Sequence, residues 1–251
     1  MAKSGSQPAR ERPAADPVDT GISARRRVNK DAVLREATRL FAERGYDGMS
    51  MGDLAARVGL RKASLFHHFP TKDALYERVL TDLVERLQTV IVGTLSAERP
   101  ILERLDLVSD ALTSALGEQP DAARLLVGQA VHRVPLAEHV VGKGIESVLG
   151  AARAFVQKGQ REGVFDRDLD PSHVVLSLVG VYFLPFSMEE IVERFMGTKP
   201  GHAGFTSGRV VASREQLRRM LGVRREVSST ETATKSKSSG KPGKRRTPER
   251  R

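Results

Sequence analysis

Cysteine is absent from this chain, which excludes a disulfide framework, a thiolate metal site and a cysteine nucleophile. Long apolar runs are absent as well, and none reaches the length that a helix needs to cross a bilayer. The first residues lack the apolar segment of a signal peptide. We therefore expect a protein of the reducing cytoplasm.

The usual marks of an enzyme are also missing. No glycine-rich phosphate loop follows a strand, no stretch alternates as a strand does, and no His-Glu-x-x-His or similar metal spacing occurs. Serine, histidine and aspartate are present, but scattered residues cannot be assembled into a catalytic triad without a structure. We predict a protein that is not an enzyme, with no catalytic residue, no cofactor and no metal.

What the chain does have is an excess of positive charge at its two ends. Residues 1–28 hold six Lys or Arg against three Asp or Glu, and residues 224–251 hold ten against three, so the net charge of +10 leaves residues 29–223 neutral. We predict that residues 1–26 and 224–251 are disordered basic segments. These segments, including Arg25–Arg27 before the first helix, either add salt-dependent DNA affinity or are solvated charge.

Residues 50–69 have the pattern of two helices joined by a tight turn. The first helix has an apolar face at helical spacing, made of Met51, Leu54, Ala55 and Val58. Ser50 precedes this helix as an N-cap residue, Asp53 takes the third position of a capping box, and Gly59 ends the helix. The second helix, Lys62–His68, presents polar and cationic residues, as a helix that enters the major groove of DNA requires.

Two segments within residues 27–87 carry a family resemblance, AVLREATRLFAERGY and GYDGMSMGDLAARVGLRKASLFHHFPTKDALY. In order and spacing they resemble the DNA-binding domain of the TetR family of bacterial transcriptional regulators. The resemblance implies an all-α fold. A three-helix N-terminal domain (27–87) would contain the helix-turn-helix at 50–69, and a C-terminal helical domain (88–223) would bind an effector and dimerise.

The resemblance also implies a function, that of a sequence-specific DNA-binding transcriptional regulator. Such a homodimeric repressor binds a palindromic operator in double-stranded DNA and leaves it when a small hydrophobic effector binds. The alternative is a charge-driven, sequence-independent DNA-binding protein that uses its basic tails. Removal of the tails should abolish DNA binding only in the second case. No membrane partner is expected.

The second helix of the motif carries most of the expected DNA contacts. The predicted contacts are Ser50, Arg61, Lys62, Ala63, Ser64, Phe66, His67, His68 and Lys72. Arg61 and Lys62 can each hydrogen-bond guanine, and Ala63 can touch a thymine methyl. Phosphate contacts are assigned to Ser50, Ser64, His68 and Lys72. The chain departs from the family pattern at three positions. Arg61 stands where serine is common, and Phe66 stands where tyrosine is common and so lacks its hydroxyl. Gly52 stands where relatives can carry a base-contacting arginine and offers no side chain.

Helical spacing predicts the remaining elements. The expected helices are Lys30–Arg44, Lys72–Val92, Ile101–Leu116, one from Pro120, one from Pro135 to Glu162, one from Pro171 to Phe186, and one from Ser213 to Gly222. Residues 197–212 lack an apolar stripe and are expected to form a flexible loop. The helix from Pro171 is apolar nearly all round, so a partner chain should cover one side of it. Pro185 should kink this helix.

Polar and aromatic side chains on the apolar helices of the second domain are candidates for effector binding. They are His132, His139, Phe155, His173, Tyr182, Phe183 and Phe186. Their neighbours imply a pocket for a mostly hydrophobic effector. Each histidine has an alternative explanation as an ordinary core or surface residue. Release from DNA, by a ligand-driven shift between two spacings of the recognition helices, is implied by the resemblance alone.

Overall fold

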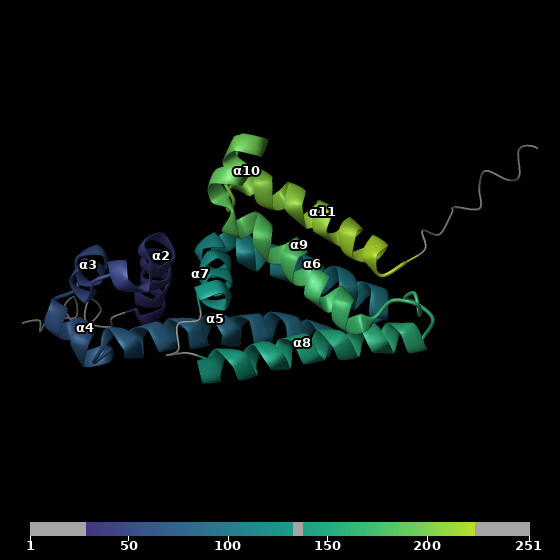
Figure 1. Ribbon diagram of the computed structural model, residues 1–251, viewed down its shortest axis with the longest axis horizontal. Coiled ribbons are helices and arrows are strands. Elements are labelled where there is room, and N and C mark those ends of the chain that lie inside the picture. The colour runs from purple at the N-terminus through teal and green to yellow at the C-terminus, as the bar shows by residue number, and fades with distance from the viewer. Residues whose placement is uncertain (1–28, 133–137, 224–251) are drawn as a thin grey trace, which may run out of the picture.

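The computed structural model describes residues 29–132 and 138–223, without the side chains of residues 130–140. The expectations for residues 1–26 and 224–251, and for Arg25–Arg27, lie outside the described residues. The described chain is all helical, as predicted (Figure 1). Its helices are α2 (Lys30–Gly48), α3 (Met51–Arg57), α4 (Lys62–His68), α5 (Lys72–Leu95), α6 (Ile101–Glu118), α7 (Pro120–His132), α8 (Glu138–Arg161), α9 (Pro171–Ser187), α10 (Glu189–Met196) and α11 (Ala203–Met220).

Helices α2, α3 and α4 form a small unit around one apolar core. The Asn29 side chain accepts a hydrogen bond from the Ala32 amide and so caps α2. Gly45 adopts φ +70° and breaks the helical conformation of α2, which confirms Arg44 as the last regular residue. The fully buried side chains of this unit include Val33, Leu40, Phe41, Met49, Leu54 and Leu65. The unit therefore holds α4 on a rigid base.

Helix α5 joins this unit to the rest of the chain. Its first half packs on α2, and its second half lies along α8 and against α6 (Figure 1). Helix α7 packs against α2 on one side and α9 on the other. The Tyr76 hydroxyl of α5 donates a hydrogen bond to Gln129 of α7 over 2.8 Å. Two helices, α5 and α7, thus connect the N-terminal unit to the C-terminal helices.

The C-terminal helices surround a second apolar core. Its members come from α5 to α9 and α11 and include Leu105, Leu116, Phe155, Val156, Tyr182, Phe186 and Leu217. Two ion pairs tie α11 to α6, with Arg214 Nε at 3.0 Å from Asp110 and Arg218 Nε at 2.8 Å from Asp106. Each guanidinium donates two bonds to its carboxylate, which fixes the register of the two helices.

The loop predicted for residues 197–212 is present only over residues 197–202, and the prediction is wrong for residues 203–212, which are helical. Helix α10 ends at Met196, and α11 already begins at Ala203 with His202 as its N-cap residue. Ser213, expected to start the last helix, is instead buried within α11. The first turns of α11 are rich in glycine and serine and pack through Phe205, so no apolar stripe marked them.

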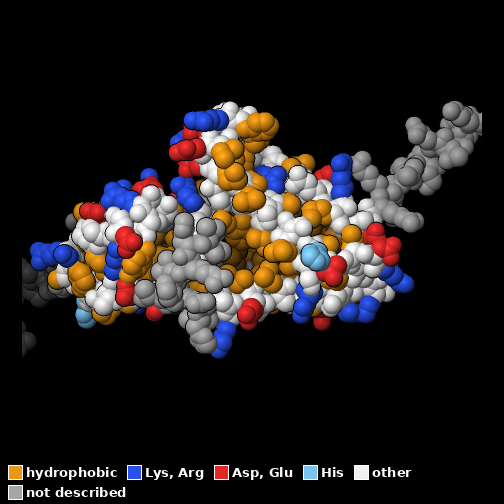
Figure 2. Space-filling model, viewed as in Figure 1, with side chains coloured by type: hydrophobic (Ala, Val, Ile, Leu, Met, Phe, Trp, Pro, Cys, Tyr) orange, Lys and Arg blue, Asp and Glu red, His pale blue; other side chains and the backbone are white. Residues whose placement is uncertain are grey.

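Helix α9 begins at Pro171 with Asp170 as its N-cap, as predicted. Pro185 lies within this helix, and the chain bends by 78° just beyond it, between α9 and α10. No single helix of residues 29–132 or 138–223 is long and apolar enough to span a bilayer; only the bent pair α9 and α10 passes that test jointly. Apolar side chains also reach the surface around α10 and along α9 (Figure 2).

Candidate functional site

Helix α4 stands on buried apolar side chains and is aligned by polar contacts of α3. Leu65 and Phe69 anchor it in the N-terminal core. The Ser50 hydroxyl accepts a hydrogen bond from the Asp53 amide at 3.1 Å and caps α3. Asp53 in turn accepts a hydrogen bond from Arg44 at 2.9 Å, which ties the start of α3 to the end of α2. These contacts hold the exposed face of α4 in a fixed orientation.

The exposed face of α4 carries basic side chains that form no ion pair within the described chain. Arg61, Lys62, His67 and His68 are exposed, and no ion pair joins any of them to another residue of the described chain. Arg57 of α3 differs, because it pairs with Glu36 at 2.9 Å and with Glu43 at 3.6 Å. A cation without a carboxylate partner keeps its charge available for a phosphate or a base.

The other predicted contacts on this surface lie close by. Ala63 and Phe66 are exposed, whereas Ser64 is half-buried. The Lys62 ammonium lies 5.8 Å from the centroid of the Phe66 ring, within the range of a cation–π contact. Phe66 therefore has a contact of its own on this face, with the flexible Lys62 side chain.

Lys72 is held by residues at the end of α2, just beyond the break at Gly45. Its ammonium donates a hydrogen bond to the Asp47 carbonyl at 3.3 Å and lies 4.5 Å from the centroid of the Tyr46 ring. The Tyr46 hydroxyl donates a hydrogen bond to Asp73, and this bond raises the pKa of Tyr46 to about 12. This role of Tyr46 could not be predicted from the sequence, because only the fold brings Tyr46 next to Lys72.

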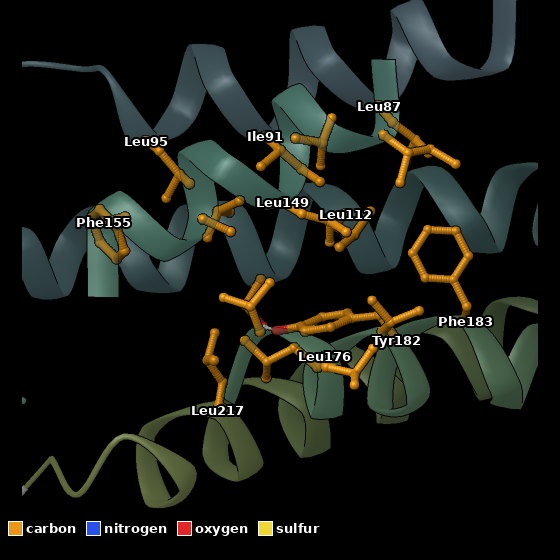
Figure 3. Close-up of a pocket in the computed structure, with 18 of the residues that line it drawn as sticks. Leu87, Ile91, Leu95, Leu112, Leu149, Phe155, Leu176, Tyr182, Phe183 and Leu217 are labelled. Carbon is orange, nitrogen blue, oxygen red and sulfur yellow. Dashed lines mark hydrogen bonds between the residues drawn. The ribbon is translucent and has the colours of Figure 1, made fainter. Parts of the chain in front are cut away.

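A second candidate site is a cavity of about 310 Å³ between α5, α6, α7, α8, α9 and α11 (Figure 3). Leucine, isoleucine and valine side chains form most of its wall, together with Phe155 and Phe183. Ser109 and Tyr182 are the two polar residues in the lining, and the Tyr182 hydroxyl donates to Ser109 at 2.8 Å. Burial raises the pKa of Tyr182 to about 12, so its hydroxyl is protonated at neutral pH.

The structure separates the predicted effector residues. Phe155, Tyr182 and Phe183 line the cavity. Phe186 does not line it but stacks edge-on against Phe205, with ring centroids 5.6 Å apart. His173 is exposed in the first turn of α9, outside the lining. The side chains of His132 and His139 lie outside the described residues.

The remaining lining residues were not found from the sequence. Ser109 and the lining leucines of α5 and α6 have the same helical spacing as any core residue, so nothing in the sequence marked them. Within the described chain, no group of three or more His, Asp or Glu side chains is placed to hold a metal ion. The chemistry of the cavity is therefore that of apolar contact and one hydroxyl pair.

Comparison with known families matches two parts of the chain. Residues 33–79 match the model of bacterial regulatory proteins of the tetR family. Residues 102–212 match the model of the C-terminal domain of tetracyclin repressor-like proteins. The first match contains α3 and α4, and the second contains most of the cavity lining.

Two curated relatives and one solved structure illustrate the similarity. The HTH-type transcriptional repressor DhaR of Mycobacterium sp. (strain GP1) is 30% identical over 144 residues, which are 55% of this chain and 71% of DhaR. The negative transcriptional regulator IcaR of the biofilm operon icaADBC, from Staphylococcus aureus (strain Newman), is 38% identical over 63 residues, 25% of this chain. The chain spans about a third (34%) of the length of IcaR.

The solved structure is that of AibR in complex with isovaleryl coenzyme A and operator DNA. It aligns with a TM-score of 0.61 at 17% sequence identity, over 77% of this chain and 98% of AibR. At that identity the likeness concerns the fold.

Proposed function

This chain belongs to the TetR family of bacterial regulatory proteins, and from this membership we propose that it is a sequence-specific DNA-binding transcriptional regulator, acting as a repressor. The observation that carries the proposal is the face of α4, where exposed cations have no carboxylate partner in the described chain. A helix so anchored and so charged suits the major groove. Repression is favoured by the similarity to DhaR, a transcriptional repressor, and to IcaR, a negative transcriptional regulator.

The proposed active form is a homodimer that pairs through α9 and α11. Leu176 and Leu184 of α9 are 66% and 46% exposed in the single chain. Other exposed apolar side chains of this region are Met188, Ile191, Phe195, Met196 and Val211. An apolar surface of this extent favours a partner. A two-fold dimer would present its two α4 helices to half-sites about 34 Å apart in a palindromic operator.

The proposed effector is a small hydrophobic molecule that binds in the cavity. The effect of ligand binding would reach the DNA-binding unit through α5 and α7. Leu126 of α7 lines the cavity and also belongs to the buried cluster that contains Phe41 of α2. A ligand that displaces α7 would bias the position of α2, and with it the spacing of the two α4 helices. The complex of AibR with an acyl coenzyme A and operator DNA provides a precedent within the same fold.

Footprinting tests the proposal. The full chain and a version trimmed to residues 27–223 would each be tested on the DNA that flanks the gene, at physiological salt. A protected palindrome with both versions, lost on Lys62→Ala or Ser64→Ala, is the expected result. Sequence-independent coating by the full chain, with no protection by the trimmed one, would instead establish charge-driven binding by the tails.

A further inference from the structure

We propose that the buried part of the effector is an uncharged chain of about ten non-hydrogen atoms with one carbonyl or hydroxyl oxygen, which hydrogen-bonds to Tyr182. This class includes medium-chain alcohols, esters and thioesters and excludes the corresponding free carboxylic acids. The inference takes one point from the proposed function, namely that the effector binds in the cavity lined by α5 to α9 and α11. What it adds is the chemical class of ligand that this cavity binds.

The lining of the cavity argues against a charged ligand group. Apart from Ser109 and Tyr182, the lining residues of the described chain are all apolar, and none of them carries a positive charge; ten of the lining residues are labelled in Figure 3. An ionised carboxylate that enters such a site loses its hydration and gains no counter-ion, at a cost of several kcal/mol. An ester or an alcohol of the same length loses far less hydration. The cavity should therefore discriminate between an acid and its ester.

Two cations of the described chain lie close to the cavity without lining it. Arg209 is half-buried and its charge acts on Tyr182, but its guanidinium donates a hydrogen bond to the Val181 carbonyl. The other cation is Arg104. It is only 6% exposed, and its guanidinium carbon lies 5.2 Å from the centroid of the Phe155 ring. That ring lines the cavity, whereas Arg104 does not. The guanidinium also donates a hydrogen bond at 2.7 Å to the carbonyl of Leu95, the last residue of α5. Arg104 is thus engaged with the negative end of α5, behind the ring of Phe155.

The hydroxyl pair can accept one ligand oxygen without leaving a polar group unpaired. At present the Tyr182 hydroxyl donates to Ser109. If the Tyr182 hydroxyl turns to a ligand carbonyl, the Ser109 hydroxyl can donate to the Tyr182 oxygen in its place. Because burial raises the pKa of Tyr182, the hydroxyl keeps its proton and remains a donor. A ligand with no oxygen would leave the original pair intact.

Size and access set the remaining limits. A cavity of about 310 Å³ holds roughly ten groups of the size of a water molecule, at about 30 Å³ each. Leu176 and Val179 line the cavity and are 66% and 37% exposed in the single chain, so the cavity reaches the surface beside α9, on the face that the proposed dimer would cover. Both a free neutral lipid and a carrier-bound acyl group share the required chemistry.

The experiment measures binding of octanol, methyl octanoate, octanoyl coenzyme A and octanoic acid to the full-length protein near neutral pH, by calorimetry. We expect the acid to bind at least about a hundred-fold more weakly than the ester, as the uncompensated burial of a carboxylate requires. Tyr182→Phe should weaken octanol and ester binding about five-fold. Ser187→Ala, which removes a hydroxyl of the same helix outside the lining, is the matched control and should change none of these affinities.

The results separate the possible sources of the ligand. Tighter binding of octanoyl coenzyme A than of the ester would identify a carrier-bound acyl group, and the reverse would identify a free neutral lipid. Acid binding equal to or tighter than ester binding, reversed by Arg104→Gln, would overturn the proposal and assign Arg104 as the counter-ion. Failure of all four ligands to bind would also overturn it. Operator affinity is measured separately, so ligand binding that leaves the operator complex intact would contradict the proposed release but not the ligand class.

Discussion

Replacing Arg61 with alanine should weaken operator binding without destabilising the protein. Arg61 is exposed at the start of α4, and its side chain neither caps that helix nor pairs with a carboxylate of the described chain. Removal of such a side chain changes the free energy of unfolding by no more than about 0.5 kcal/mol. Any large effect on DNA binding must then come from contacts with the DNA itself.

The size of the effect follows from the number of contacts. A bidentate contact between an arginine and a guanine contributes about 1–3 kcal/mol of discrimination. A dimer would make this contact twice, so Arg61→Ala should cost about 2–6 kcal/mol, a loss of affinity between roughly thirty-fold and twenty-thousand-fold. If Arg61 contacts phosphates instead, the loss is the same on any sequence, and the slope of log affinity against log salt falls by about two.

Arg57→Ala is the matched control for Arg61→Ala. Arg57 is an exposed arginine one turn before α4, but Glu36 and Glu43 neutralise it. Its loss should cost up to about 1 kcal/mol of stability and little DNA affinity. Fluorescence anisotropy with operator and scrambled duplexes at several salt concentrations, together with urea unfolding, measures both quantities. Equal losses of operator affinity in the two variants, or none in Arg61→Ala, would refute the argument from pairing.

Three further predictions concern stability. Gly45→Ala should destabilise the protein by about 1–2 kcal/mol, because Gly45 has φ +70°. Gly93→Ala within α5 should instead stabilise it by about 0.5–1 kcal/mol, because an added Cβ meets open space there. Urea unfolding should therefore give changes of opposite sign for the two variants. Burial raises the folded-state pKa of Tyr182 from 10.0 to about 12. The neutral tyrosine therefore supports the folded state fully below pH 10, and the free energy of unfolding should fall between pH 10 and 12. Tyr182→Phe should remove up to about 2.7 kcal/mol of this fall. Leu65→Ala should cost roughly 3–5 kcal/mol, since Leu65 is 0% exposed, and a thermal shift of only a few degrees would contradict this.

The helices that carry the DNA-binding motif could be predicted closely because their boundaries depend on neighbouring residues. The Ser50 oxygen caps α3 through a residue three positions away, and Gly45 ends α2 through its own backbone. Such signals are complete within one helical turn of sequence. The order of these local signals, without any long-range contact, was sufficient to identify the motif.

Helix α11 could not be predicted in the same way, since distant residues stabilise it. Its start depends on Phe205, which packs on Phe186 of α9. Its register depends on the ion pairs of Arg214 and Arg218 with carboxylates of α6, more than 100 positions earlier in the chain. The sequence of residues 197–212, rich in glycine, serine and threonine, indicates a loop as long as these partners are unknown.

The cavity was predicted only in part, because a lining leucine and a core leucine have the same sequence pattern. Aromatic residues directed attention to Phe155 and Tyr182, which do line it. The same criterion also selected Phe186, which packs elsewhere, and gave no reason to consider Ser109. Whether an apolar side chain borders an empty volume depends on how six helices pack, and that information is not local.

The contacts of the N-terminal unit limit how a ligand could act on it. Within the described chain, the main contacts of α2, α3 and α4 with later helices are those of α2 with α5 and α7. Both α5 and α7 also line the cavity, through Leu87 and Leu126 among others. A ligand that changes the packing at Leu126 therefore acts directly on a helix that touches α2, and the hydrogen bond between Tyr76 and Gln129 couples that helix to α5. If α4 moves with α2 as one packed core, as the proposed function requires, a small rotation of α7 would change where α4 meets the operator.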